Sequence, residues 1–352
     1  MKQIQDINIH QIDRTNETDL KLFLEFPLSI YENKKLIEYY IPKVKSLVSI
    51  PGDFELFIAE SSNHDIVGRM VMGKNDQIRD DHNMPFAHIG LFDVIEDYSV
   101  FKQMIDFGRK YFQKHRYLLF PFFQSTWYPY RFTSKGFDAY HYFMEFPDQP
   151  YYSEFTNRYG FEESYKYLGS ITYDMESIIS DNEYSYKKAI KNNIQFRNFD
   201  KSNVREDLKY IYELTVNNYN NITNRFFTTI SFNEFYQLYI GIIEMLDSEF
   251  LTFGVNQEGV PVCYCFSPPD YTPIILGVSD TVSGFIPKTA ATDNNYRKMG
   301  IMGGIVYLQG LEAKRRHYKY AIGGYTDERL FTHKVMPDSL EWKEYSLYQI
   351  LI

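Results

Sequence analysis

Cysteine is nearly absent from this sequence, with two residues in a chain of 352. Cys263 and Cys265 lie in one apolar run typical of a strand, and their spacing places them on the same face. Such a pair cannot close a mutual disulfide and cannot supply the four ligands of a structural zinc site. We therefore interpret both cysteines as packing residues and expect no metal centre.

Long apolar runs and an excess of positive charge are also missing. No stretch approaches the roughly 20 apolar residues of a membrane-spanning helix. The polar start, residues 1–7, lacks the basic end and apolar centre of a secretory signal. There are 37 Lys and Arg residues against 46 Asp and Glu, and the net charge of −9 opposes binding to polyanions. We expect a cytoplasmic protein whose partners include neither nucleic acid nor a membrane.

Hydrophobic residues, at 44% of the chain, and aromatic residues, at 18%, are plentiful enough for substantial cores. At roughly 150 residues per domain, the length suggests two domains. Periodicity in the first half predicts alternating strands and helices. The predicted elements are a hairpin of strands 55–60 and 66–72, a strand at 87–93, a helix at 98–115, a strand at 118–123, a helix at 150–161 ended by Gly160, and a strand at 165–173.

Residues 174–192 are polar and predict no more than one short helix, so we place the domain connection there. The second half repeats the order of the first, which suggests a duplication. Its predicted elements are helices 204–219 and 231–245, a hairpin of strands 249–255 and 260–266, a strand at 285–291, a helix at 301–315, a strand at 318–323, a helix at 327–335 and a strand at 342–350. We predict an α/β protein of two domains, 1–173 and 193–352, each with a mixed, mainly antiparallel sheet flanked by helices.

One segment of the second half has the character of an anion site. Residues 288–304 run from a strand through a polar turn into a helix whose start holds Gly300, Gly303 and Gly304. Backbone N–H groups and the dipole at a helix N-terminus bind phosphate, and Arg297 adds a positive charge. The alternative is that the glycines only allow an ordinary helix to pack closely. The residues alone leave both interpretations open.

This segment resembles the acyl-CoA loop of the GNAT acyltransferase superfamily, in which Gln or Arg is followed by x-x-Gly-x-Gly/Ala. Residues Arg297 to Gly300 match, but Met302 replaces the last small residue and Gly303 follows one position later. The hairpin that ends in residues 267–271 extends the resemblance. The first half resembles the front domain of a bacterial tandem-GNAT family through four short motifs, at 26–31, 136–138, 150–152 and 159–161.

The resemblance implies an N-acyltransferase, in the first instance an acetyltransferase. It would move an acyl group from acetyl-CoA or another acyl-CoA to the amine of a small molecule. Asp327 stands where these proteins usually carry Asn. The residues that the resemblance assigns to acyl-CoA binding are Thr289, Ala290, Ala291, Arg297, Lys298, Met299, Gly300, Met302, Gly303 and Asp327.

Catalysis by such an enzyme needs an acid for the leaving thiolate and a neutral attacking amine. Many family members carry the acid as a Tyr about seven residues after the Asn. Counting from Asp327 reaches Lys334, so that Tyr is missing here. The resemblance leaves Tyr325 as the substitute acid, and Asp270 and His333 as candidates for deprotonating the amine.

In the first half, the turn at residues 94–99 stands where an acyl-CoA loop would be. It has no glycine and offers Glu96 and Asp97, whose charges would repel a diphosphate. We therefore expect a degenerate first domain and one acyl-CoA per chain. We also expect the chain to form a homodimer.

Two other functions remain open at this point. One is a non-catalytic ligand-binding or assembly protein on a decayed GNAT scaffold, which Met302 and the missing Tyr favour. The other is an aminoacyl transferase of the Fem type, which takes its acyl group from charged tRNA. The net charge of −9 disfavours this second alternative.

Overall fold

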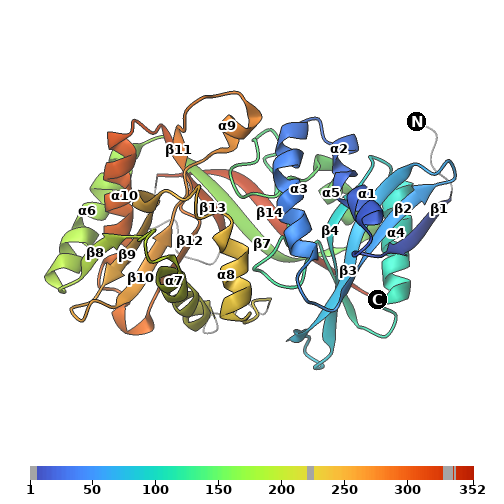
Figure 1. Cartoon of the computed structure of the whole chain (residues 1–352), viewed down its shortest axis with the longest axis horizontal. Helices are drawn as coiled ribbons and strands as arrows, with labels where there is room; N and C mark the ends of the chain where they lie inside the picture. The colour runs from blue at the N-terminus through green and yellow to red at the C-terminus, as the bar shows by residue number, and fades with distance from the viewer. Residues whose placement is uncertain (1–5, 220–225, 328–335, 337) are drawn as a thin grey trace. The chain divides into compact units, whose positions relative to one another are not determined.

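The computed structural model describes residues 6–219, 226–327, 336 and 338–352 (Figure 1). The chain divides into two compact units. The first holds residues 1–166, 225–228 and 344–352, and the second holds 167–224 and 229–343. Each unit combines a sheet with flanking helices, as the sequence predicts.

The first unit is built on a mixed sheet with the strand order β1-β2-β3-β4-β5-β14, in which β6 also pairs with β14. β4 and β5 are parallel, and the other pairs are antiparallel. A core of aromatic and aliphatic side chains joins the sheet to α4 and α5. The elements are β1 (Ile7–Ile12), α1 (Glu17–Glu25), α2 (Pro27–Ile30), α3 (Lys34–Val48), β2 (Phe54–Ser61), β3 (Ile66–Arg79), β4 (Pro85–Val94), α4 (Tyr98–Tyr111), β5 (Tyr117–Phe120), β6 (Phe132–Lys135), α5 (Pro150–Tyr159) and β14 (Leu340–Leu351).

The second unit contains an antiparallel sheet, β12-β10-β9-β8, and the strand β13, which pairs with β11 and with residues 167–172 of β7, whose first residues, 162–166, belong to the first unit. Cys263 and Cys265 on β10 face an apolar cluster with α10, while Tyr264 between them faces α7. The elements are β7 (Glu162–Thr172), α6 (Met175–Lys191), β8 (Gln195–Asn198), α7 (Val204–Tyr219), α8 (Phe232–Ile240), β9 (Leu251–Val255), β10 (Pro261–Phe266), α9 (Thr272–Leu276), β11 (Gly284–Phe285), β12 (Thr289–Thr292), α10 (Ile301–Arg315) and β13 (Tyr320–Asp327), with short 3-10 turns at Ser248–Phe250 and Asn294–Tyr296.

The segment 174–192, expected as a linker, forms the long helix α6 and belongs to the second unit. Glu176 near its start pairs with Lys314 near the end of α10, and Ser185 lies beside Gly303 at the start of α10. The two helices therefore run antiparallel, side by side (Figure 1). The segment differs from a linker because Ile178, Asn182 and Ala189 give an otherwise polar helix a buried face.

Other elements also differ from the sequence prediction: α4 ends at Tyr111 and β5 at Phe120, both earlier than expected, and β13 extends to Asp327. α8 ends at Ile240, well before 245. The strand expected at 285–291 is divided at Pro287, which has no N–H to donate, into β11 and β12. The last strand forms as expected, but its residues from 344 onward pack in the first unit. The helix expected at 327–335 lies outside the described residues except for Asp327, which ends β13.

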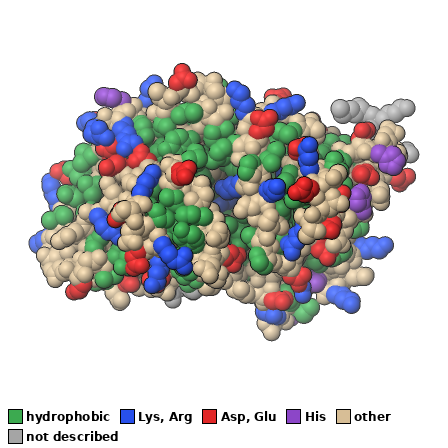
Figure 2. Space-filling model, in the orientation of Figure 1, with side chains coloured by type: hydrophobic (Ala, Val, Ile, Leu, Met, Phe, Trp, Pro, Cys, Tyr) green, Lys and Arg blue, Asp and Glu red, His purple; other side chains and the backbone are tan. Residues whose placement is uncertain are grey.

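The sequence predicts no membrane-spanning helix and no excess of positive charge, and both expectations can be compared with the described part of the chain. No helix in it has both the length and the apolar character needed to cross a membrane. Acidic and basic side chains are interspersed on the face shown in Figure 2.

Candidate functional site

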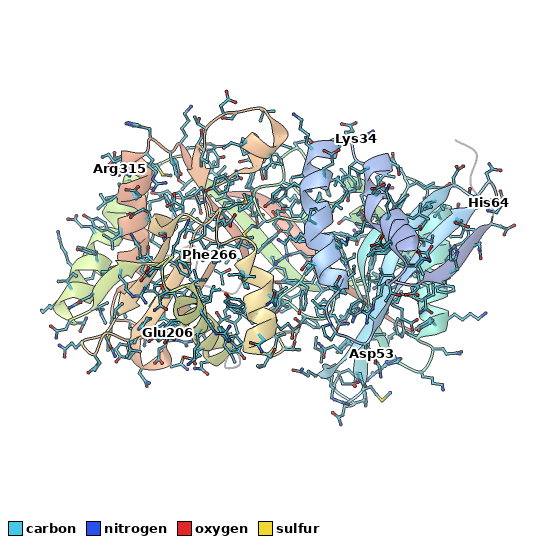
Figure 3. All side chains as sticks on the ribbon, viewed as in Figure 1. Lys34, Asp53, His64, Glu206, Phe266 and Arg315 are labelled. Atoms are coloured by element: carbon cyan, nitrogen blue, oxygen red, sulfur yellow. The ribbon has the colours of Figure 1, made fainter. Side chains whose placement is uncertain are left out.

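The second unit contains a point where two neighbouring strands diverge. Residues 284 and 285 pair in parallel with 320 and 321 of β13. After Pro287, the chain leaves β13 and continues as β12, which pairs with β10 in the register Phe266 to Thr289. Phe266, the last residue of β10, is labelled in Figure 3. Among the described strands, β12 is thus the edge of its sheet, with one side of its backbone available to a ligand.

The polar turn after β12 leads into the N-terminus of α10. Gly300 is the N-cap, with φ +87°, and no side chain caps this helix. The first intrahelical bond runs from the N–H of Gly304 to the carbonyl of Gly300 at 2.8 Å. The positive end of a 15-residue helix therefore lies next to the edge strand β12.

The glycines of α10 are explained by close packing. A Cβ on Gly300 would lie 2.3 Å from the Ser185 carbonyl oxygen, and a Cβ on Gly303 would lie 2.5 Å from Cβ of Ser185. Gly304 is in close contact with the ring of Phe196. The packing interpretation therefore accounts for these residues, and Gly300 additionally needs its positive φ. Met302 packs at the edge of the apolar cluster with Ala290 and Met299, so this departure from the GNAT motif lies against the protein core.

Three basic residues surround the start of α10. Arg297 and Lys298 lie exposed on the turn, and Arg297 Nη2 donates to Asn218 Oδ1 at 2.5 Å. The third is Lys188 on α6. Its Cβ is so close to Gly300 that a Cβ added to this glycine would lie 3.2 Å from it. Sequence reasoning missed Lys188, since it treated its segment as a linker. Only the pairing of α6 with α10 brings this lysine to the helix start.

The equivalent helix of the first unit begins differently. Asp97 is the N-cap of α4, and its Oδ1 accepts hydrogen bonds from the backbone N–H of Ser99 at 2.8 Å and from the Ser99 hydroxyl at 2.7 Å. The chain's own carboxylate therefore occupies the position where an external anion would bind. This cap is a physical reason for expecting no anion site in the first half.

Tyr325 and Lys288 face each other across the divergence. The ammonium of Lys288, just before β12, lies 5.0 Å from the centre of the Tyr325 ring on β13. Tyr325 has φ +49° at a bulge, where the pairing of β13 with β7 shifts between Gly323 and Thr326. The bulge re-aims the side chain of Tyr325. Thr289 and Ala290, half-buried, continue from Lys288 along β12, followed by the buried Ala291.

Asp270 lies at the other end of this region, where β11 and β13 are still paired. Its Oδ2 accepts from the Tyr320 hydroxyl at 2.9 Å, and its backbone N–H donates to Gly284. The carboxyl is fully buried and joins the three segments that meet there. These two hydrogen bonds show Asp270 in a structural role, in which it holds Tyr320 and Gly284 in place. Its role as a base stays a prediction, as does that of His333, which lies outside the described residues together with Lys334.

The cysteines behave as packing residues. Cys263 and Cys265 are free and buried, and burial raises the pKa of their thiols to about 12 and about 11. They are therefore protonated and unreactive at neutral pH. No cluster of His, Cys, Asp and Glu in the described residues is arranged to hold a metal ion.

No protein-family model and no curated protein matches this sequence. Solved structures do match its fold. The GCN5-related glucosamine N-acetyltransferase region of a fungal multi-domain GH3 β-N-acetylglucosaminidase aligns over 98% of this chain with a TM-score of 0.58 and 13% identity. This chain spans only 38% of that one.

Two further structures cover more of their own length. A tandem GNAT protein from the clavulanic acid biosynthesis pathway aligns over 98% of both chains, with a TM-score of 0.52 and 9% identity. The N-myristoyltransferase of Saccharomyces cerevisiae, solved with bound myristoyl-CoA, aligns over 99% of this chain and 80% of its own, with a TM-score of 0.51 and 10% identity. The chain therefore has the tandem GNAT fold, and its structural neighbours include acyltransferases.

Proposed function

We propose that this chain is an acyltransferase that binds acyl-CoA in its second unit and acylates the amine of a small molecule. One observation carries the proposal. The uncapped N-terminus of α10 lies beside the edge strand β12 at the divergence of β12 from β13. The first unit has its own carboxylate at the corresponding helix start.

The residues present fit an acyl-CoA. A diphosphate would be held by the first N–H groups of α10 with Arg297, Lys298 and Lys188, and a pantetheine arm carries amide groups that can bond to the free edge of β12. Bound there, acyl-CoA supplies an activated carbonyl. Tyr325 is the phenol on the opposite strand and can donate a proton to a leaving group. The acceptor class rests on the resemblance to N-acetyltransferases.

The direct test is to measure the binding of acetyl-CoA by calorimetry. A second measurement is the melting temperature, which a ligand that binds only the folded state raises. Lys188→Ala and Arg297→Ala should each weaken binding about tenfold, because each removes a charge-assisted contact with phosphate. Lys187→Ala is the matched control. It changes the neighbouring lysine of the same helix, which pairs with Glu183 at 2.7 Å. Gly300 is unsuitable for this purpose, since any side chain there would collide with α6.

Turnover separates the remaining alternatives. Thiol release from acetyl-CoA in the presence of a panel of amines would support the transferase. Binding without turnover for any amine would favour the non-catalytic ligand-binding protein. Absence of binding at millimolar acetyl-CoA, with tight binding of charged tRNA at physiological salt, would contradict the proposal in favour of the Fem-type enzyme.

A further inference from the structure

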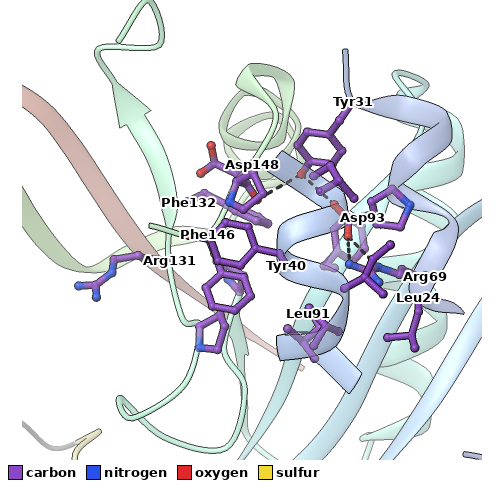
Figure 4. Close-up of a pocket in the computed structure, with 18 of the residues that line it drawn as sticks. Leu24, Tyr31, Tyr40, Arg69, Leu91, Asp93, Arg131, Phe132, Phe146 and Asp148 are labelled. Carbon is purple, nitrogen blue, oxygen red and sulfur yellow. Dashed lines mark hydrogen bonds and ion pairs between the residues drawn. The ribbon is translucent and has the colours of Figure 1, made fainter. Parts of the chain in front are cut away.

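The first unit contains a cavity of about 70 Å³ (Figure 4). It lies where β4 leaves β5: these strands pair at Ala87 and His88, and the cavity is lined further along β4 by Leu91, Phe92 and Asp93. Leu91 has φ +42°, within an irregularity of the pairing between β3 and β4. Helices α1 to α3 and the segment 146–148 supply the rest of the wall, which is mostly aliphatic and aromatic.

A buried ion pair forms the polar part of the cavity wall. Arg69 donates from Nε to Asp93 Oδ2 at 2.7 Å, and its Nη2 lies 2.6 Å from the same oxygen. Asp93 Oδ1 accepts from the hydroxyls of Tyr31 at 2.9 Å and Tyr152 at 3.1 Å. Desolvation by burial, together with the charge of Asp93, raises the pKa of both tyrosines well above the usual range, so both stay protonated donors. Each oxygen of Asp93 therefore already accepts two bonds.

Arg69 has donors left over. A guanidinium carries five N–H bonds. Nε and Nη2 bond to Asp93, and Nη1 donates to the carbonyl of Phe23 at 2.8 Å. Among the described residues no acceptor accounts for the second N–H of Nη1 or of Nη2, although Arg69 is only 6% exposed. A buried donor without a partner is costly, so the cavity favours an occupant with an acceptor atom.

The charges around the cavity narrow the class of occupant. An ammonium would find no free oxygen on Asp93, and a carboxylate would lie beside that negative charge. Asp148 Oδ2 in the wall accepts the backbone N–H of Thr133, and the Arg131 guanidinium stacks on the ring of Tyr130, 4.1 Å from its centre, with Nη1 buried. An uncharged carbonyl oxygen suits the remaining donors of Arg69.

The size of the cavity limits what enters it. A cavity of about 150 Å³ admits benzene, so about 70 Å³ takes three or four non-hydrogen atoms. Ile37, Val44 and Leu91 offer these atoms an apolar surface. We propose that the first unit binds the short, uncharged acyl end of a small amide, with its carbonyl oxygen on Arg69 and its alkyl group against the apolar wall. This site is independent of the acyl-CoA site proposed for the second unit.

Three probes that each carry one methyl group test the proposal on the full chain: acetamide, acetate and methylamine. Ligand-observed NMR should show acetamide binding at least tenfold more tightly than the other two. Val44→Phe, which fills the cavity, and Arg69→Lys, which keeps a cation beside Asp93 but loses the planar donors, should each weaken acetamide binding at least tenfold. Leu22→Phe is the control, because Leu22 is 43% exposed on α1 and does not line the cavity.

Each outcome either supports or overturns the proposed amide site in the first unit. Loss of binding in both variants, with the melting temperature of Val44→Phe retained, supports the site. If Arg69→Lys fails to fold, the Val44→Phe result and the order of the three probes still decide. Tighter binding of the amine or of the carboxylate would overturn the assignment of the carbonyl to Arg69. Failure of all three probes to bind at millimolar concentration would show that the cavity holds only water.

Discussion

His88 lies within β4 with 1% of its surface exposed, and desolvation lowers its pKa to about 3. A side chain of this kind makes the stability of the first unit depend on pH. The imidazole stays neutral in the folded chain at pH values where the unfolded chain binds a proton, below about 6.5.

We expect this histidine to destabilise the fold as the pH falls. The folded pKa is depressed, so the unfolded state binds more protons between about 6.5 and 3, and stability is lost through that window as pH decreases. His88→Gln cannot take up this proton and should show a flatter pH dependence. Urea unfolding at pH 7.5 and pH 4.5 measures the difference. Equal losses in both proteins would mean that other groups control the acid transition.

Tyr325 allows a second test at the level of one residue. Tyr325→Phe removes the hydroxyl but keeps the ring against Lys288, so folding and acetyl-CoA binding should be retained. If the phenol is the acid, kcat should fall about 100-fold with little change in KM. Tyr307→Phe serves as the control, since Tyr307 stacks on Tyr186 with ring centres 4.9 Å apart. A kcat unchanged by Tyr325→Phe would remove this residue from the chemistry.

At the scale of elements, the pairing of α6 with α10 decides what the glycines do. Small residues at the crossing let the backbones approach, and Gly303 is in direct contact with Ser185. Helix packing at this distance leaves no room for an added methyl group, because protein interiors are close-packed.

Gly303→Ala should therefore destabilise the second unit by about 1 to 3 kcal/mol, the usual cost of overpacking. Ser185→Gly removes the two nearest atoms that the new Cβ would meet, Cβ at 2.5 Å and Oγ at 2.7 Å, and leaves Asn182 Oδ1 at 3.0 Å, so the double variant should lose less than the sum of the two single changes. Gly241→Ala is the control, since a Cβ there meets nothing within 4 Å. Denaturant unfolding of the four proteins gives the coupling. Strict additivity would show that the crossing is not tight.

The sequence predicts elements well where periodicity and capping agree. α7 and α10 have the predicted limits, and Ser231, where the helix 231–245 is predicted to begin, caps α8 by accepting the N–H of Glu234. It does not predict β1 or α1 to α3, and Pro42 inside α3 interrupts the usual pattern of a helix. The buried face of α6 was missed because its polar residues dominate the segment. Lys188 and the cavity at Arg69 depend on which elements meet, and periodicity does not carry that information.

At the scale of the whole chain, the two units differ in what their helix starts offer to an anion. Asp97 caps α4, whereas no side chain caps α10. The division into two halves follows from length and from the repeated order of elements. The sequence does not predict that residues 344–352 return to the first unit, because the pattern of a strand carries no information on which strand it pairs with.

Calorimetry with acetyl-CoA should therefore give one site per chain. The carboxylate of Asp97 repels a diphosphate and already occupies the N–H group of Ser99 that would hold it. Substitutions at Arg297 or Lys188 should lower the affinity of this single site, while Asp97→Asn should leave it unchanged. A stoichiometry of two would contradict the asymmetry between the units.

The last strand has a consequence for how this protein is made. Residues 344–351 of β14 pair with β5 and β6 of the first unit, so the ribosome adds this strand later than its pairing partners and later than the second unit. At about 5 to 20 residues per second, β5 waits roughly 10 to 45 seconds for this partner with an unpaired edge, which can join a neighbouring nascent chain. The unit that is synthesised first is therefore completed last, after residues 167–343 have all been added.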